Sequence, residues 1–303
     1  MAYSIEYQIL TGIINVLNRT LLINYNEFTM MKNSFCIAFL LVIFASCQTT
    51  EQIIYTSNNT LNSTLWMQTA AEYEALGYQA YNISSSLLET AYNDSSWTAS
   101  LEQGDSYASL PPAIILDLDE TAIDNLFYEA RMILDNSSFD PDTWNSWVRE
   151  REAEAIKGAV ELIGKADSMG VSVFYITNRD ASVQESTEQN LRNLGFPISE
   201  GAVMSNGGQP SWTSAKTERR KLVADNYRIL MLFGDDLNDF LPARGISIDK
   251  RKALVKEHRN KWGVKWFVLP NPNYGSWERA LYTGDEEEKF QQTKLDLLDD
   301  KRN

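Results

Sequence analysis

Residues Ala113 to Thr121 read AIILDLDET, an apolar run followed directly by an acidic one. The run Ala113–Leu116 comes after two prolines, and a short apolar run bounded by turn formers is typical of a strand buried on both faces of a parallel sheet. Ligands bind beyond the carboxyl ends of the strands in open parallel sheets. The stretch therefore predicts a buried strand that delivers Asp117 and Asp119 to a ligand site.

Further apolar runs have the same character and alternate with segments of helical periodicity. The runs are Val171–Ile176, Gly201–Met204, Ile229–Phe233 and Trp266–Leu269. Helices are expected over Leu65–Leu88, Gly158–Met169 and Ser214–Ala224. Parallel strands joined through helices form right-handed crossovers. We therefore predict an α/β fold, a doubly wound (Rossmann-like) parallel sheet with helices on both faces.

Two details modify this prediction. Gly77 lies within the first helical stretch and is expected to loosen that helix locally. The chain between Thr121 and Thr177 is long enough for a small helical lid or subdomain, but not for a full cap domain, so we expect a site open to varied substrates.

Composition excludes several chemistries. The 303 residues include 27 Lys and Arg against 41 Asp and Glu, a formal net charge of −14, with one histidine and two cysteines. A zinc site or a disulfide framework needs more Cys and His than this. A Ser-His-Asp triad would have to use His258, which lies in a charged stretch and is expected to be a solvated surface side chain. The acidic balance argues against binding of polymeric nucleic acid.

The N-terminal region has the pattern of an export signal. Lys32 precedes the apolar run Phe35–Phe44, which is too short for a membrane span of about 20 residues, and small residues then lead to Cys47. This pattern resembles a bacterial lipobox. We interpret residues 30–46 as a lipoprotein signal peptide and residues 1–29 as a start-site artefact. Cys47 would then carry the lipid that anchors the protein in the cell envelope, at the outer membrane or the cell surface.

The remaining boundaries follow from composition. Residues 47–63 are polar and are interpreted as a tether. Residues 64–284 form the expected folded domain with its small helical subdomain. Residues 285–303 are rich in acidic side chains and are interpreted as a solvated, acidic C-terminal tail.

Chemically active side chains follow successive predicted strands. They are Asp117 and Asp119 after the first, Thr177 and Asn178 after the second, Asp235, Asp236 and Asp239 after the third, and Lys216 at the start of the helix before the third. A single acidic residue after a strand is an ordinary turn former or helix cap. Their joint occurrence in this order predicts one shared site at the carboxyl edge of the sheet.

These stretches resemble the haloacid dehalogenase superfamily of phosphotransferases, and more closely its class C acid phosphatases, the bacterial lipoprotein 5′-nucleotidases. The similar stretches are Ile115–Thr121, Phe174–Arg179, Lys216–Arg220 and Gly234–Phe240, with further matches at Leu65–Asn82, Trp144–Trp147 and Asn273–Glu278. The lipobox at Cys47 fits the same family.

The resemblance implies a mechanism in which Asp117 is the nucleophile and forms an aspartyl phosphate. Asp119 lies two residues further along an extended chain, so both carboxylates point to one side, and it would act as general acid and then general base. The resemblance also implies a Mg²⁺ ion held by the Asp117 carboxylate, the Asp119 backbone carbonyl and Asp235.

Supporting roles follow in the same way. Asp236 and Asp239 would order metal-bound water or support the metal ligands. Thr177 and the Asn178 backbone would bind the phosphoryl oxygens, and Lys216 would neutralise the charge that grows there. Trp144 and Tyr274 are the expected pair for stacking a nucleobase.

We therefore predict a Mg²⁺-dependent acid phosphatase that acts on small phosphorylated substrates, with nucleoside 5′-monophosphates as the favoured class. The alternatives are a phosphatase for sugar phosphates or other small monoesters, and a non-catalytic surface-binding lipoprotein. The single histidine leaves proton transfer to a carboxylic acid, so we expect an acidic working pH. The oligomeric state stays open, a homodimer being one arrangement considered.

Overall fold

The computed structural model describes residues 60–282 and 290–301. By internal contacts the chain divides into two units, Met1–Ser57 and Asn58–Asn303, and the described residues belong to the second. The predicted start-site artefact, the signal peptide and Cys47 all lie outside the described residues, and so does most of the predicted tether.

The centre of the fold is a parallel sheet of five strands. They are β1 (Pro112–Leu116), β4 (Ser172–Asp180), β5 (Val203–Asn206), β6 (Arg228–Gly234) and β7 (Trp266–Val268). Their order is β5-β4-β1-β6-β7, so the chain starts in the middle and winds outward in both directions. Leu116, the last residue of β1, pairs with Tyr175 of β4 and Phe233 of β6, so the loops after β1 and β6 begin beside the second half of β4, which contains Thr177. The predicted doubly wound parallel sheet is confirmed.

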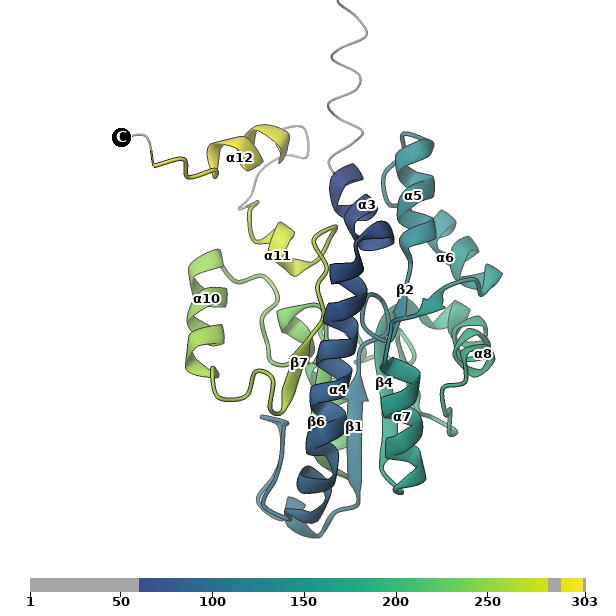
Figure 1. The fold of residues 1–303 in the computed structure, drawn as a ribbon, viewed down its shortest axis with the longest axis vertical. Coiled ribbons are helices and arrows are strands. Elements are labelled where there is room, and N and C mark those ends of the chain that lie inside the picture. Colours follow the sequence, from purple (N-terminus) through teal and green to yellow (C-terminus); the bar gives the residue numbers. More distant parts are fainter. Residues whose placement is uncertain (1–59, 283–289, 302–303) are drawn as a thin grey trace, which may run out of the picture. The chain divides into compact units, whose positions relative to one another are not determined.

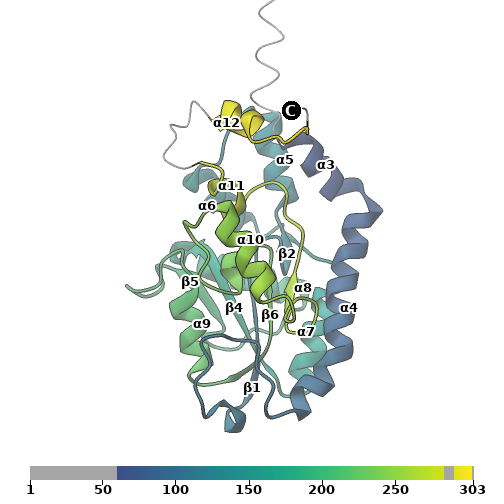
Figure 2. The ribbon, with the colours of Figure 1, turned by 90° about the vertical axis from the view of Figure 1, so that its left-hand side faces the viewer.

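Helices cover both faces of the sheet. Alternate residues of β1 enter different buried clusters: Ile114 and Leu116 join one, and Ala113 and Ile115 the other. Helices α4 (Ala71–Asn93), α7 (Ala159–Ser168) and α8 (Gln184–Leu194) contribute to the first cluster. Helices α9 (Thr217–Ala224) and α10 (Ile248–Glu257) contribute to the second. Figures 1 and 2 show α4 and α7 side by side, and Figure 2 shows α9 on the other side of the strands.

The first helical stretch differs from the prediction, because it forms two helices rather than one. Helix α3 (Leu61–Thr69) starts within the predicted tether, and α4 follows after a break at Ala70, whose ψ of 126° is extended. The break lets α3 pack against α5 (Leu126–Leu134), where Gln68 Nε2 donates to the Leu126 carbonyl at 3.2 Å. A continuous helical pattern cannot reveal such a break, since a contact distant in sequence decides it.

Gly77 has a different role from the one expected. It lies buried within the continuous helix α4, and a Cβ there would come within 3.1 Å of the Lys157 carbonyl oxygen. The glycine therefore allows a close approach of two chain segments, and α4 remains helical around it.

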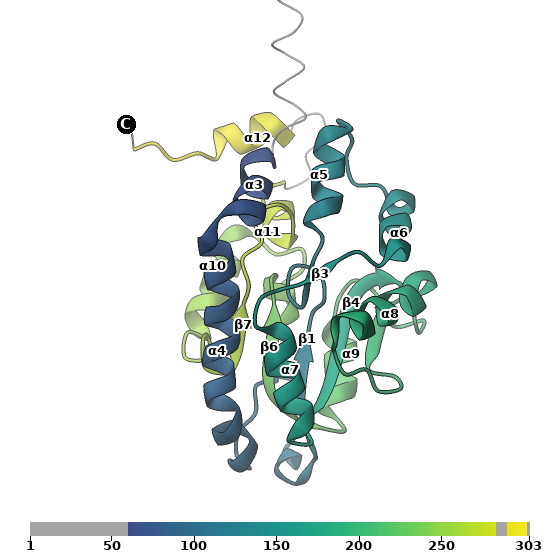
Figure 3. The same ribbon diagram turned by 45° about the vertical axis from the view of Figure 1, so that its right-hand side comes forward.

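The segment between β1 and β4 forms a small subdomain. Strands β2 (Ile123–Asp124) and β3 (Glu154–Ala155) pair antiparallel, and α5 and α6 (Pro141–Glu150) lie between them in the chain. Asp140 caps α6 by accepting from the backbone N–H groups of Asp142 and Thr143. Figure 3 shows α5 and α6 beyond the carboxyl ends of the strands, where a lid would lie.

Short elements complete the described chain. They are η1 (Tyr107–Ser109), η2 (Ala181–Val183), η3 (Leu237–Asp239), α11 (Ser276–Arg279) and α12 (Phe290–Asp296), the last within the predicted acidic tail. His258 follows α10 and packs against Trp266 with ring centroids 5.2 Å apart, so it is more enclosed than the expected surface side chain. Within residues 60–282 and 290–301, no helix has both the length and the apolar character needed to cross a membrane.

Candidate active site

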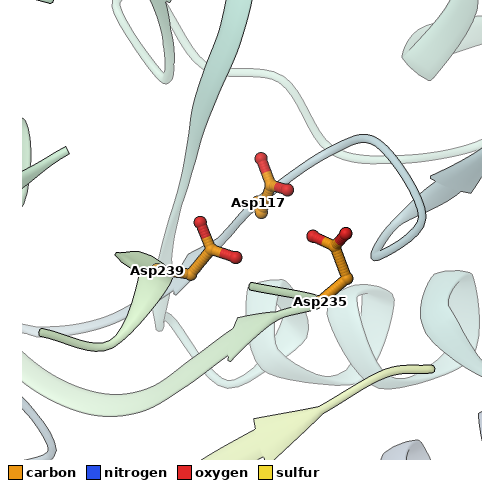
Figure 4. Close-up of side chains that lie close together, drawn as sticks. All are labelled: Asp117, Asp235 and Asp239. Carbon is orange, nitrogen blue, oxygen red and sulfur yellow. The ribbon is translucent and has the colours of Figure 1, made fainter. Parts of the chain in front are cut away.

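Three carboxylates meet where the central strands end. Asp117 follows β1, Asp235 follows β6, and Asp239 belongs to η3 just beyond it. One carboxylate oxygen from each lies within 4.8 Å of the others, and Figure 4 shows the three side chains converging on a common point. Gly234 permits this arrangement, because a Cβ at that position would collide with the side chain of Asp239.

Lys216 neutralises part of this charge. It lies at the start of α9, is only 4% exposed, and places Nζ 2.5 Å from Asp117 Oδ1 and 2.6 Å from Asp239 Oδ1. Burial alone would lower the pKa of Lys216, but the two carboxylates outweigh burial and raise the pKa. The side chain therefore stays an ammonium ion at neutral pH.

One ammonium ion does not balance the carboxylates. Burial, followed by repulsion from Asp117 and Asp239, raises the pKa of Asp235 well above the ordinary value. Burial and the same kind of repulsion raise the pKa of Asp239 to about 7, although Lys216 opposes the shift. A group of buried oxygen ligands with excess negative charge fits a hard divalent cation. Asp117, Asp235 and Asp239 are the residues that could hold one, and of these Asp235 makes no contact with Lys216 that would compete with the cation.

Asp119 lies in a network that the sequence did not reveal. Its Oδ1 accepts from Arg179 Nε at 2.9 Å and from Asn125 Nδ2 at 2.9 Å. Asn125 Oδ1 in turn accepts from Trp147 Nε1 at 2.9 Å. Arg179 stood within a matched stretch without an assigned role, and Asn125 was not singled out. Only their approach to Asp119 in three dimensions reveals them.

Of the predicted phosphate-binding residues, Thr177 lies beside Asp119 and Asn178 lies next to Arg219. Thr177 Oγ1 is 3.4 Å from Asp119 Oδ2. The side chain of Asn178 accepts from Arg219 Nη2 at 2.8 Å and donates to the Ser214 carbonyl at 3.2 Å, so it organises the chain before α9. Arg219 also donates to the Thr177 carbonyl. This second buried arginine was likewise not predicted to take part.

Asp236 and Tyr274 belong to the wall of the site. The Asp236 carboxylate accepts from the backbone N–H of Ser276 at 2.6 Å and from the Ser276 hydroxyl, and so holds the start of α11. The predicted role of Asp236 in ordering metal-bound water stays a prediction. Asn271 joins the site to the predicted stacking residue: its Nδ2 donates to Asp235 Oδ2 at 2.8 Å, and its Oδ1 accepts from the Tyr274 N–H at 3.4 Å.

Trp144, the other predicted stacking residue, lies on α6. The Arg179 guanidinium lies 5.6 Å from the centre of its ring, and Tyr128 packs edge-on against it with ring centroids 5.1 Å apart. Trp144 is therefore near the network of Asp119. Whether Trp144 and Tyr274 act as a pair stays a prediction.

The fold and the site together define a class of protein. A doubly wound sheet with buried carboxylates and a lysine at its carboxyl edge is suited to phosphoryl transfer through an aspartate. Residues 44–277 match the HAD superfamily, subfamily IIIB (acid phosphatase), and the chain belongs to this family. The predicted family is thereby confirmed, and phosphoric monoester hydrolase is the enzyme class of that family. Its phosphatases generally use a divalent metal ion, which agrees with the carboxylate cluster.

Solved structures and curated relatives that resemble this chain include further acid phosphatases. The class C acid phosphatase from Bacillus anthracis is 31% identical with a TM-score of 0.70, and the alignment covers 80% of this chain and 98% of that one. The same protein with tungstate bound gives 32% identity and a TM-score of 0.71 over the same shares of both chains. Acid phosphatase 1 of Solanum lycopersicum is 29% identical over 53% of this chain and 57% of its own length. The stem 28 kDa glycoprotein of Glycine max is 26% identical over 53% of this chain, and there too the match spans little more than half of the relative.

Asp235→Asn should change stability in a way that depends on pH and on metal. The folded-state pKa of Asp235 is raised, so the metal-free protein holds an extra proton, and the stability that this gives is lost as the pH rises through the raised pKa. The variant has no such proton to lose. Its free energy of unfolding, from urea denaturation in EDTA, should therefore fall less between about pH 5 and pH 8 than that of the wild type.

A divalent cation should stabilise the wild type more than the Asp235→Asn variant. At a concentration of about 100 Kd it should stabilise the wild type by roughly 2.7 kcal/mol and stabilise Asp235→Asn far less. Thermal unfolding with Mg²⁺, Mn²⁺ and Ca²⁺ in turn measures the response. An equal stabilisation of both proteins would place the cation elsewhere.

Proposed function

We propose that this protein is a Mg²⁺-dependent acid phosphatase that hydrolyses phosphate monoesters through an aspartyl-phosphate intermediate, with nucleoside 5′-monophosphates as its main substrates. The observation that carries the proposal is the joint position of Asp117, Lys216 and Asp235 at the carboxyl edge of the sheet, with Asp119 beside them. Family membership supports the reaction class.

Residues of this chain can carry out both steps of the reaction, the formation of the aspartyl phosphate and its hydrolysis. The Asp117 carboxylate attacks phosphorus, the bond from phosphorus to the leaving oxygen breaks, and Asp119 gives its proton to that oxygen. Asp119, now a carboxylate, then takes a proton from water as the water oxygen attacks phosphorus. Inorganic phosphate leaves, Asp117 is regenerated, and Asp119 is again protonated.

Other residues stabilise the phosphoryl group. Lys216 supplies positive charge next to Asp117, and Thr177 with the Asn178 backbone N–H would donate to the phosphoryl oxygens. Asp117, Asp235 and the Asp119 backbone carbonyl would hold Mg²⁺. When bound, the ion would screen the repulsion between the anionic nucleophile and the anionic substrate.

The proposed preference for nucleotides rests on the aromatic side chains near the site. A nucleobase can stack on any flat ring; Trp144 lies against Arg179 of the Asp119 network, and the Tyr274 backbone is linked to Asp235 through Asn271. Sugar phosphates and other small monoesters are the alternative substrates, since a small helical subdomain in place of a full cap is expected to leave the site open. A surface-binding lipoprotein without turnover is the remaining alternative.

Asp117→Asn should abolish phosphatase activity, because an amide cannot act as the nucleophile. We expect kcat/KM for p-nitrophenyl phosphate to fall by roughly a thousandfold or more at saturating Mg²⁺. Asp249→Asn, which changes an exposed aspartate on α10, is the matched control and should keep wild-type rates. Full activity of Asp117→Asn would contradict the mechanism, and a wild-type protein without Mg²⁺-dependent turnover would favour the non-catalytic alternative.

Tyr274→Ala should weaken the use of nucleotides selectively. Loss of one base-stacking contact costs about 1–3 kcal/mol, so kcat/KM for adenosine 5′-monophosphate should fall by about five- to a hundredfold. The value for ribose 5-phosphate, which has no base, should stay within about twofold of wild type. Tyr92→Ala is the matched control, because this exposed tyrosine lies at the other end of the sheet, beside Arg228 at the start of β6. Equal losses on both substrates would favour the sugar-phosphate alternative.

We also propose that Cys47 carries a lipid anchor that holds the enzyme in the cell envelope. The support is the export pattern of residues 30–46, which lie outside the described residues. Metabolic labelling with a radioactive fatty acid tests this: label is expected on the wild-type chain, and label that persists in a Cys47→Ser chain would exclude Cys47 as the attachment site.

A further inference from the structure

We propose that Arg179, together with Asn125, is a positioning residue that fixes which oxygen of Asp119 carries the transferred proton. This inference rests on the proposed function, because it concerns the same transfer to the leaving oxygen. It assigns a function to a buried arginine–amide network that the mechanism above does not use.

The two carboxylate oxygens of Asp119 have different hydrogen-bond partners. Oδ1 accepts from two N–H donors, Arg179 Nε at 2.9 Å and Asn125 Nδ2 at 2.9 Å, and Arg179 Nη2 lies 2.8 Å away as the second nitrogen of the ion pair. Oδ2 has the Thr177 hydroxyl at 3.4 Å. Both lone pairs of Oδ1 are thus occupied by N–H donors, which leaves no position for a hydrogen, so the proton of the carboxylic acid must lie on Oδ2.

The orientation of the Asn125 amide follows from its neighbours. Asn125 Oδ1 accepts from Trp147 Nε1 at 2.9 Å and from Arg179 Nη2 at 3.1 Å, and both of these groups are donors only. The amide nitrogen must therefore face the carboxylates of Asp119 and Glu120, where it donates to Oδ1 and Oε1. The network has one self-consistent arrangement of donors and acceptors.

Arg179 is itself held from several sides. It is 1% exposed, its Nη1 lies 3.4 Å from Thr187 Oγ1, and its guanidinium lies over the ring of Trp144. Its backbone N–H donates to Thr177 Oγ1 at 3.0 Å. A planar guanidinium can donate to Asp119 through Nε and to Asn125 through Nη2 at the same time, which a lysine ammonium cannot reproduce with the same geometry.

The same contacts favour the outcome of the transfer. When Asp119 has given up its proton, its carboxylate is paired with a buried guanidinium and hydrogen-bonded to Asn125. The negative charge thus forms where it is already compensated. The benefit should therefore be largest for substrates whose leaving oxygen must be protonated, and small for substrates that expel a stable anion.

The test compares leaving groups in the full-length protein. For Arg179→Met, kcat/KM for a nucleoside 5′-monophosphate should fall by roughly a hundredfold or more, which is the usual contribution of general acid catalysis. The same ratio for 2,4-dinitrophenyl phosphate, whose leaving group needs no proton, should fall by less than about threefold. Arg179→Lys should lie between Arg179→Met and wild type for the nucleotide alone.

The controls separate positioning from folding. Arg192→Met removes an exposed arginine of α8 that pairs with Glu188, and it should match wild type on both substrates. Asn125→Ala removes one of the two hydrogen-bond donors to Asp119 Oδ1 and should show the same selective loss at a smaller size, which gives a second measurement if Arg179→Met does not fold. An equal loss on both substrates, or no loss on either, would overturn the inference.

The two proposals fail in distinguishable ways. If Asp117→Asn is inactive on both substrates while the Arg179 variants lose activity equally on both, only the positioning role is wrong. If Asp117→Asn stays active, the proposed function is wrong whatever the Arg179 variants do.

Discussion

The buried contact of Lys216 with Asp117 and Asp239 is the interaction on which the site depends. Its ammonium lies 2.5 and 2.6 Å from the two carboxylates, and all three side chains are almost fully enclosed. Removing one partner of a buried pair usually costs about 3–5 kcal/mol, because the remaining charge is left without compensation. Lys216 does not reach Asp235, and burial together with repulsion from Asp117 and Asp239 raises the pKa of that carboxyl. A cluster with more carboxylates than cations is suited to a metal ion, which would also offset the repulsion between the cluster and an anionic substrate.

The topology explains how residues so distant in the chain meet. The central strand β1 lies between β4 and β6, and Leu116 at its end is level with Tyr175 and Phe233. Right-handed crossovers return each strand in the same direction, so the loops that follow them share one edge. Alternate residues of β1 enter buried clusters on opposite faces of the sheet, so the sheet is held between two layers of helices. The acidic loop beyond β1 can then use its side chains for chemistry, because the core does not need them.

Much of this could be predicted from the sequence. The apolar run at Ala113–Leu116 and the similar runs along the chain define the parallel sheet, and the acidic residues after Ala113–Leu116 and Ile229–Phe233 define the edge where the site lies. The break at Ala70 and the close approach at Gly77 could not be predicted, because contacts with α5 and Lys157 decide them. The network around Asp119 could not be predicted either, because contacts between residues distant in sequence form it. Arg179 and Asn125 are far apart in sequence, and only their hydrogen bonds to one carboxylate oxygen give them a joint role.

The central claim is that Asp117, held beside Lys216, is the residue that receives the phosphoryl group. Rapid acid quenching of the wild-type enzyme during turnover, followed by peptide mapping with mass spectrometry, tests it most directly, since acyl phosphates survive in acid long enough to be mapped. The account predicts a phosphorylated peptide with the modification on Asp117. A phosphoryl group on any other residue, or turnover without a phosphorylated enzyme under conditions in which formation outpaces hydrolysis, would contradict it.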